Sequence, residues 1–300
     1  MDFKPRWNHS NVVVDIDPNL GKLGFYADGA LLTDICQYIV DNSPIDDFGS
    51  AYKIKDSNED FLTIRTLVDT DWKDKNQDGS EENKIANAKD AVDVISWNLS
   101  KYNGRRVSAQ DLANGYEAYF DAVMKSYADS FISMHNTKAY ADIEAELDKR
   151  TNQVKVLDLY AMSNEKVGDE VNDLAASLEE YTDKLIKNGI DPTRITIQAK
   201  PRIFAKLAKS TAIGNNAAEA IRNGVLTFQA LDGYKVRKNR FMKKYDVIVS
   251  YDAGVVSKVK VISAIVAKEK SYFNDMVAAM EAQNAFKIEK PEVFLAIKKA

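Results

Sequence analysis

The sequence predicts an α+β fold. Two stretches, at 112–131 and 167–185, carry apolar residues at spacings of three and four, which is typical of amphipathic helices. Short strand-like runs lie before and after these stretches, without the regular strand–helix alternation of a doubly wound parallel sheet. At 300 residues and 45% hydrophobic residues, the chain is long enough to bury a substantial core.

The first 24 residues are polar and contain two prolines and two glycines, which predicts an extended arm with one short strand at Val12–Val14. A helix is expected from Asp28 to Asp41, because apolar residues between Leu31 and Ile39 recur at helical spacing. This helix should end before Pro44, since the residue preceding a proline avoids the helical region.

In residues 44–106 the apolar runs have a strand-like pattern rather than the helical spacing of the preceding segment. The runs at 61–68 and 92–99 read as strands, and the segment between them, 71–90, is almost wholly polar. Two strands with a long polar tip predict a protruding β-hairpin. Because an isolated two-stranded hairpin has only marginal stability in water, this hairpin must pack against another surface, which can belong to another molecule.

The polar tip contains Asp74-Lys75-Asn76-Gln77-Asp78-Gly79, which matches the first half of a calcium loop, with oxygen ligands at positions 1, 3 and 5 and glycine at 6. The twelfth position, where a bidentate glutamate belongs, is Ile85. Two interpretations stay open, a calcium site and a solvated turn.

A long helix is predicted to begin at Ser108, with Asp111 completing a pair that resembles a capping box. A separate, more polar helix is expected at about 139–149. The next helix should run from about Asn164 to Lys187 and end at Asn188-Gly189.

The C-terminal part predicts short elements. Strands are expected at 195–197, 225–228, 247–249, 255–262, 286–288 and 293–297, and helices at 201–207, 217–223 and 273–283, with an Asp-Gly turn at 232–233.

Few residues point to chemistry. Cys36 is the only cysteine and reads as a small buried residue; the two histidines, His9 and His135, are far apart in sequence. Cysteine-based zinc sites and an intrachain disulfide are therefore excluded. No phosphate loop, dinucleotide-binding glycine motif or nucleophile elbow is present. We therefore expect no enzyme and assign no catalytic, cofactor-binding or metal-binding residues and no cofactor. No secretory signal is present, and no apolar run has the length of a membrane span.

The charge is divided between the two parts of the chain. Residues 1–189 carry a net charge of −14 and residues 190–300 a net charge of +10. Three interpretations stay open: a nucleic-acid surface in the basic part, self-association of unlike surfaces, and two solvated faces without a partner.

The order of these elements resembles the major capsid proteins of tailed bacteriophages, which have the Hong Kong 97-type fold. The resemblance covers most of the chain from the hairpin onward and rests on order and spacing. Its segments are the strand at 92–99 with a bend at Gly104-Arg105-Arg106 before the helix from Ser108, the helix and strand at 174–197, the helix at 201–207, Gly224-Val225, Asp232–Val236 with Asn239, Tyr251–Val256, and the closing elements at 273–283 and 291–297.

The resemblance implies five parts. These are an N-terminal arm and short helix at 1–43, an extended β-hairpin loop at 44–106, a peripheral domain with a spine helix at 107–210, an axial domain at 211–262, and a return to the peripheral domain at 263–300. It further implies a structural subunit that self-assembles into the icosahedral shell around a tailed-phage genome. An encapsulin-like bacterial cargo shell and a nucleic-acid-binding protein that uses the basic part remain the alternatives.

The implied partners are copies of the chain itself in pentamers and hexamers, a portal protein, and packaged DNA bound without sequence specificity, with no membrane. No scaffolding segment precedes the arm, so a separate scaffolding protein is expected. The implied location is the capsid of the virion, after assembly in the cytoplasm of the bacterial host.

Overall fold

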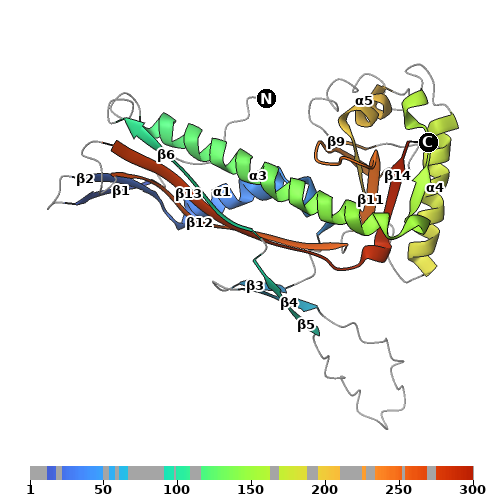
Figure 1. The fold of residues 1–300 in the computed structure, drawn as a ribbon, viewed down its shortest axis with the longest axis horizontal. Helices are drawn as coiled ribbons and strands as arrows, with labels where there is room; N and C mark the ends of the chain where they lie inside the picture. The colour runs from blue at the N-terminus through green and yellow to red at the C-terminus, as the bar shows by residue number, and fades with distance from the viewer. Residues whose placement is uncertain are drawn as a thin grey trace, which may run out of the picture.

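The computed structural model of the 300-residue chain describes residues 12–17, 22–49, 54–57, 61–66, 91–97, 99–108, 116–162, 169–187, 195–209, 225–227, 234–251, 254–268 and 275–299. These residues form three sheets and four α-helices (Figure 1).

An elongated sheet, named here the spine sheet, forms one part of the molecule. Its strands pair antiparallel in the order β1 (Val12–Asp17), β2 (Lys22–Ala27), β12 (Val255–Lys268), β13 (Asp275–Ile288) and β6 (Leu99–Ser108). Helices α1 (Gly29–Asp41) and α3 (Tyr116–Asp148) lie along one face of this sheet (Figure 1). Alternate residues of β13 from Ala278 to Ala282 are buried in the core beneath these helices.

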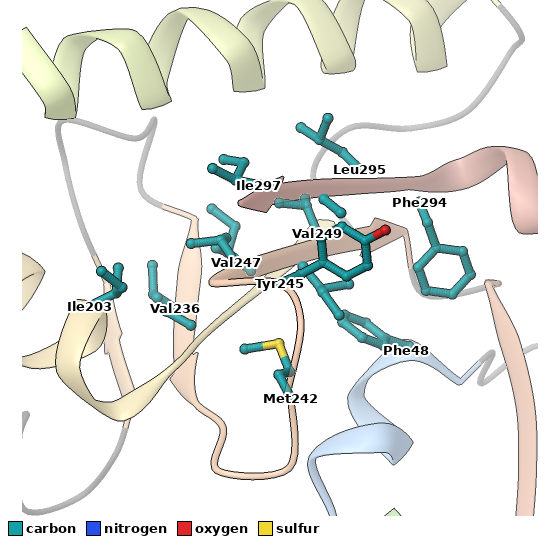
Figure 2. Close-up of a cluster of buried hydrophobic side chains, with 14 of the residues drawn as sticks. Phe48, Ile203, Val236, Met242, Tyr245, Val247, Val249, Phe294, Leu295 and Ile297 are labelled. Atoms are coloured by element: carbon teal, nitrogen blue, oxygen red, sulfur yellow. The ribbon is translucent and has the colours of Figure 1, made fainter. Parts of the chain in front are cut away.

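A six-stranded sheet forms the other part. Its order is β7 (Val154–Val156), β14 (Phe294–Lys298), β11 (Val247–Tyr251), β8 (Ile195–Ala199), β10 (Lys235–Lys238) and β9 (Val225–Thr227). Helices α4 (Asp169–Lys187) and α5 (Pro201–Lys209) pack on it, and 3-10 turns lie at Pro44–Phe48, Thr151–Gln153, Leu159–Ala161 and Pro291–Val293. Figure 2 shows Val247, Val249 and Ile297 of two neighbouring strands within this core.

A small antiparallel sheet, named here the loop sheet, consists of β3 (Ile54–Ser57), β4 (Phe61–Thr66) and β5 (Ala91–Ser96). It stands away from both other sheets, below the spine sheet in Figure 1. The hairpin predicted between 61–68 and 92–99 is confirmed by the pairing of β4 with β5, with β3 as a third strand.

Helix α3 joins the two parts. Its 33 residues span about 50 Å at 1.5 Å per residue. Phe120, Phe131 and neighbouring apolar residues pack against the spine sheet, whereas Tyr140 and Leu147 belong to the core of the six-stranded sheet. One continuous helix therefore connects both cores.

Gly254 brings the two sheets close together where β12 begins. A Cβ at this position would collide with Ser250 Oγ and lie 3.0 Å from Phe294 Cζ. The Gly254 carbonyl accepts hydrogen bonds from the backbone N–H of Glu289 (3.0 Å) and Lys290 (3.3 Å). Only glycine fits this contact without a shift of its neighbours.

Several predicted elements are confirmed. Helix α1 begins after Asp28, whose side chain accepts a hydrogen bond from the N–H of Leu31 at 2.8 Å, and it ends before Pro44. Helix α4 buries the predicted apolar positions from Val171 to Leu185, and α5 has Pro201 in its first turn.

The beginning of the spine helix was predicted wrongly. Ser108 is the last residue of β6, where it pairs with Asp275, so it is not a helix N-cap. Gly104-Arg105-Arg106 is not a bend but lies within β6, with Gly104 opposite Ala279. The separate helix at 139–149 is also wrong, because α3 is continuous to Asp148.

The predicted helix at 273–283 is wrong as well. Asp275–Ile288 forms the strand β13, which pairs with β12 on one side and with β6 on the other. Alanine, methionine, glutamate and glutamine favour helix locally, but pairing on both edges overrides that preference. The neighbouring strand β12 continues to Lys268, beyond the predicted end at 262.

The N-terminal and domain boundaries also differ from the expectation. The segment before α1 holds two paired strands, β1 and β2, and β2 joins β12 of the spine sheet. Because β8 shares a sheet with β10 and β11, and β12 lies in the spine sheet, the expected boundaries at 210 and 262 do not coincide with the sheets. The boundary at 106 falls inside β6, a spine-sheet strand.

Asp111, the helix end at Asn188-Gly189 and the polar tip at 71–90 lie outside the described residues, and so do four further predicted features. These are His9, the calcium-loop-like segment Asp74 to Gly79, the helix at 217–223 and the turn at 232–233.

Candidate functional site

Side chains capable of chemistry are dispersed. Among the residues that the structure describes, no group of three or more histidine, cysteine, aspartate or glutamate side chains could hold a metal ion. Cys36 is half-buried, and its thiol donates to the Val259 carbonyl at 3.1 Å. Burial raises the pKa of this thiol, which disfavours the nucleophilic thiolate. Cys36 therefore has the environment of a packing residue, as predicted.

His135 is buried in the middle of α3. The Asn284 amide lies against His135 Nδ1, and Ser257 Oγ lies 3.4 Å from Nε2. Since the amide nitrogen is a donor, Nδ1 accepts and the proton lies on Nε2. Burial lowers the pKa of His135 to about 4, so the ring is neutral at pH 7. This histidine joins α3 to β12 and β13 through hydrogen bonds.

A second polar contact ties α3 to the turn after α1. The amide of Asn136 donates to Ser43 Oγ at 3.0 Å and to the Ile132 carbonyl at 2.8 Å. Its oxygen accepts from the Ile45 N–H at 3.2 Å. Both polar atoms of the buried Asn136 side chain are thus hydrogen-bonded, which fixes the turn on the helix.

Gln198 extends this contact to the six-stranded sheet. Its amide nitrogen donates to the Pro44 carbonyl at 2.6 Å, and its oxygen accepts from Asn239 at 2.8 Å and from the Tyr140 hydroxyl. Beside this group, Arg237 pairs with Asp47 at 2.6 Å. Both polar atoms of the buried Gln198 side chain are hydrogen-bonded, and these contacts join the turn at Pro44 and helix α3 to the six-stranded sheet.

The loop sheet contacts the body through few apolar residues. Ile95 of β5 is buried together with Val256 and Ala285 of the spine sheet, and Trp97 packs beside them. The neighbouring Val94 is 56% exposed. Within the described residues, this small cluster is the apolar anchor of a sheet that stands away from the body (Figure 1).

The described surface has a polar hollow of about 360 Å³ between α4 and the residues before β7. Glu180 lies in its wall and pairs with Lys155 and Lys184, both at 2.7 Å. These hydrogen bonds lower the pKa of Glu180 to about 2. A carboxylate held ionised in this way cannot serve as a general acid near neutral pH. No helix among the described residues is long and apolar enough to cross a membrane.

Comparison with solved structures identifies the fold. The capsid structure of the cyanophage P-SCSP1u is similar over 86% of this chain and 88% of its own, with a TM-score of 0.52 and 11% sequence identity. The chain has the fold of a phage capsid protein. The Hong Kong 97-type fold expected from the resemblance is thereby confirmed, with α3 as its spine helix.

Two further structures are similar at lower scores. A virus-like particle from Pyrococcus furiosus matches 89% of this chain and 99% of its own, at a TM-score of 0.48 and 12% identity. A structure from Mycobacterium phage Che8 matches 80% of this chain and 85% of its own, at a TM-score of 0.45 and 12% identity. No protein-family model matches the chain, and no curated protein matches it in sequence.

Proposed function

We propose that this chain is a structural subunit that assembles with copies of itself into the shell of a tailed bacteriophage. The observation that carries the proposal is the fold, which is similar to that of a cyanophage capsid subunit over 86% of the chain. The proposed role is structural rather than enzymatic, and Cys36 and His135 are engaged in packing and hydrogen bonding.

The architecture supports this function physically. A shell subunit has to transmit a fixed angle from one neighbour to the next, and the buried contacts of Asn136 and Gln198 provide a rigid joint between the two parts. The loop sheet, anchored through Ile95, is placed where a neighbouring copy could bury its remaining surface. Many modest contacts then act together in one particle.

The proposal has finer parts, which concern the domains, the partners and the place of assembly. The six-stranded sheet with α4 and α5 serves as the axial domain, and the spine sheet with α1 and α3 serves as the peripheral domain. Copies form pentamers and hexamers, with a separate scaffolding protein and a portal protein as partners. The shell forms in the cytoplasm of the bacterial host and encloses DNA without reading its sequence.

The test is the assembly state of the purified full-length chain. Sedimentation velocity across a range of protein and salt concentrations should show rings or shells, which negative-stain microscopy would image. Nuclease-protected DNA inside particles from infected cells would support a genome shell, whereas a co-purifying enzyme would indicate a cargo shell instead. A chain that stays monomeric under all these conditions contradicts the proposal.

A further inference from the structure

One end of the six-stranded sheet gathers basic residues from distant parts of the sequence. Val247, the first residue of β11, lies opposite both Ala199 of β8 and Ile297 of β14. The chain leaves β8 toward Arg202 and leaves β14 toward Lys298 and Lys299 at this same end. The strand β10 runs parallel to β8 and ends at Lys238, so Arg240 follows there as well.

Some cations at this end already have acceptors. Lys200 pairs with Asp246 at 3.1 Å, Lys244 pairs with Asp148, and Lys206 donates to the Tyr160 and Met162 carbonyls at 2.6 and 2.9 Å. Five others are exposed and form no ion pair with any described carboxylate. We name these five the basic end: Arg202, Arg240, Lys243, Lys298 and Lys299.

The basic end has an ordered centre. The guanidinium of Arg202 lies 5.1 Å from the centre of the Tyr160 ring, and the ammonium of Lys299 lies 5.5 Å from the same centre. Arg240 is held over Phe241 at 5.1 Å. Cation–π contacts position these charges while their outer sides remain open to a partner.

Helix α4 presents the opposite charge. It buries Val171, Leu174 and Leu178 against the sheet and turns carboxylates outward. Four exposed carboxylates, which form no ion pair with a described cation, are named here the acidic stripe: Asp169, Asp173, Glu179 and Asp183.

The acidic stripe contains two pairs of like charges at helical spacing. Asp169 and Asp173 are four residues apart, as are Glu179 and Asp183, and like charges at this spacing destabilise a helix. Glu180 on the same helix, in contrast, is paired with two lysines. A cationic surface outside the subunit would relieve this repulsion.

The basic end and the acidic stripe point in different directions. The stripe lies on the outer side of a helix that packs on the sheet, whereas the basic end lies where β8, β10 and β14 end. The two unlike surfaces are therefore available to different neighbours. Repeated contact between unlike surfaces closes into rings when the rotation allows it.

We propose that the basic end of one copy docks on the acidic stripe of α4 in the next copy. This interface rests on the proposed shell function and names the surfaces that bring neighbouring subunits together. A second copy is the occupant because it carries a complementary surface whose charges form no ion pair among the described residues. The contact orients subunits before the apolar surfaces meet and weakens as salt screens it.

The test is a charge reversal with rescue in the full-length chain. One variant carries Arg202→Glu and Lys299→Glu, another carries Asp173→Lys and Asp183→Lys, and a third carries all four changes. Each of the first two should need at least about tenfold more protein to assemble at low salt. The third should regain most of the wild-type assembly, because the attraction is restored with its signs exchanged.

Lys235→Glu is the matched control, because Lys235 is exposed and lies at the opposite end of β10. It should assemble as the wild type does. Circular dichroism should show that every variant is folded. Should a reversal variant fail to fold, the milder pair Arg202→Gln and Asp173→Asn should each still raise the assembly concentration.

The outcomes separate this interface from the shell function itself. Normal assembly of both reversal variants overturns the interface while the shell function stands. The interface is also overturned if the variant with all four substitutions needs as much protein to assemble as either reversal variant. It is likewise overturned by a basic-end variant that assembles normally but loses retention of double-stranded DNA in a gel shift, because the surface would then bind nucleic acid. A wild-type chain that never assembles contradicts the shell function and the interface with it.

Discussion

Lowering the pH from about 7 to about 5 should destabilise the folded chain through His135. The ring is buried and its pKa is about 4 in the folded state, compared with an ordinary value of 6.5. Between these two values the unfolded chain binds the proton and the folded chain does not, so stability falls as the pH falls. The loss is about 2 kcal/mol between pH 7 and pH 5 and approaches about 3 kcal/mol below pH 4.

The pH window isolates this histidine from the carboxylates. Ion pairs hold the pKa of Glu180 at about 2 and the pKa values of Glu146 and Asp148 below their ordinary values. Their stabilising effect is present above the ordinary carboxylate pKa and is lost only as the pH falls below it. From pH 7 to pH 5 these carboxylates therefore contribute little to the change.

Urea unfolding at several pH values measures the effect, with the chain kept below its assembly concentration. His135→Gln cannot titrate, so it should abolish most of the pH dependence in this window, whatever its own stability at pH 7. His9→Gln, the substitution of the only other histidine, serves as the control and should keep the wild-type slope. Equal slopes for the wild type and His135→Gln would show that His135 is not the group responsible for the pH dependence.

Three further predictions follow from packing. Ile197→Ala, fully buried in β8, should lower the free energy of unfolding by about 2–5 kcal/mol, whereas Ile186→Ala, 54% exposed on α4, should change it by less than about 1 kcal/mol; urea titration compares the two. Gly254→Ala should destabilise by about 1–3 kcal/mol through overpacking, while Gly29→Ala, which has open space around it in α1, should be neutral or stabilising in a thermal melt. Arg237→Met should leave Asp47 without its ion-pair partner and cost about 1–3 kcal/mol, and a gain in stability would contradict this.

Helices with a clear apolar face were predictable from the sequence. The stripe of α4 and the Asp28 cap of α1 are local features, because they depend on residues within one helix. Helix α3 was predicted as two helices because its apolar stripe is interrupted at the polar residues His135 and Asn136, and Glu144 lies in the second of these helices. These three side chains are buried and hydrogen-bonded, which no periodicity of apolar residues could indicate.

The strand β13 was missed for a related reason. Buried positions alternate with partly exposed ones along this strand, and the buried ones include Ala278, Met280 and Ala282. Two of these three are alanine, which is a strong helix former. The strand exists because β12 and β6 both pair with it, and β6 lies more than 160 residues earlier. Such long-range pairing overrides local propensity.

The basic end could not be located from the sequence either. The charge split between the two parts of the chain was visible, but Arg202, Lys243 and Lys299 come together only through the strand order of the six-stranded sheet. The sequence therefore showed a charge split with three open interpretations, and the topology brings the residues of the proposed basic end together.

The most direct test of the account is a cryo-electron microscopy reconstruction of whatever the purified full-length chain forms. The proposed shell function predicts a closed shell in which each subunit has α3 across its spine sheet and the loop sheet contacts a neighbouring copy. A chain that yields only monomers, or a particle whose subunits do not contact one another through these surfaces, would contradict it.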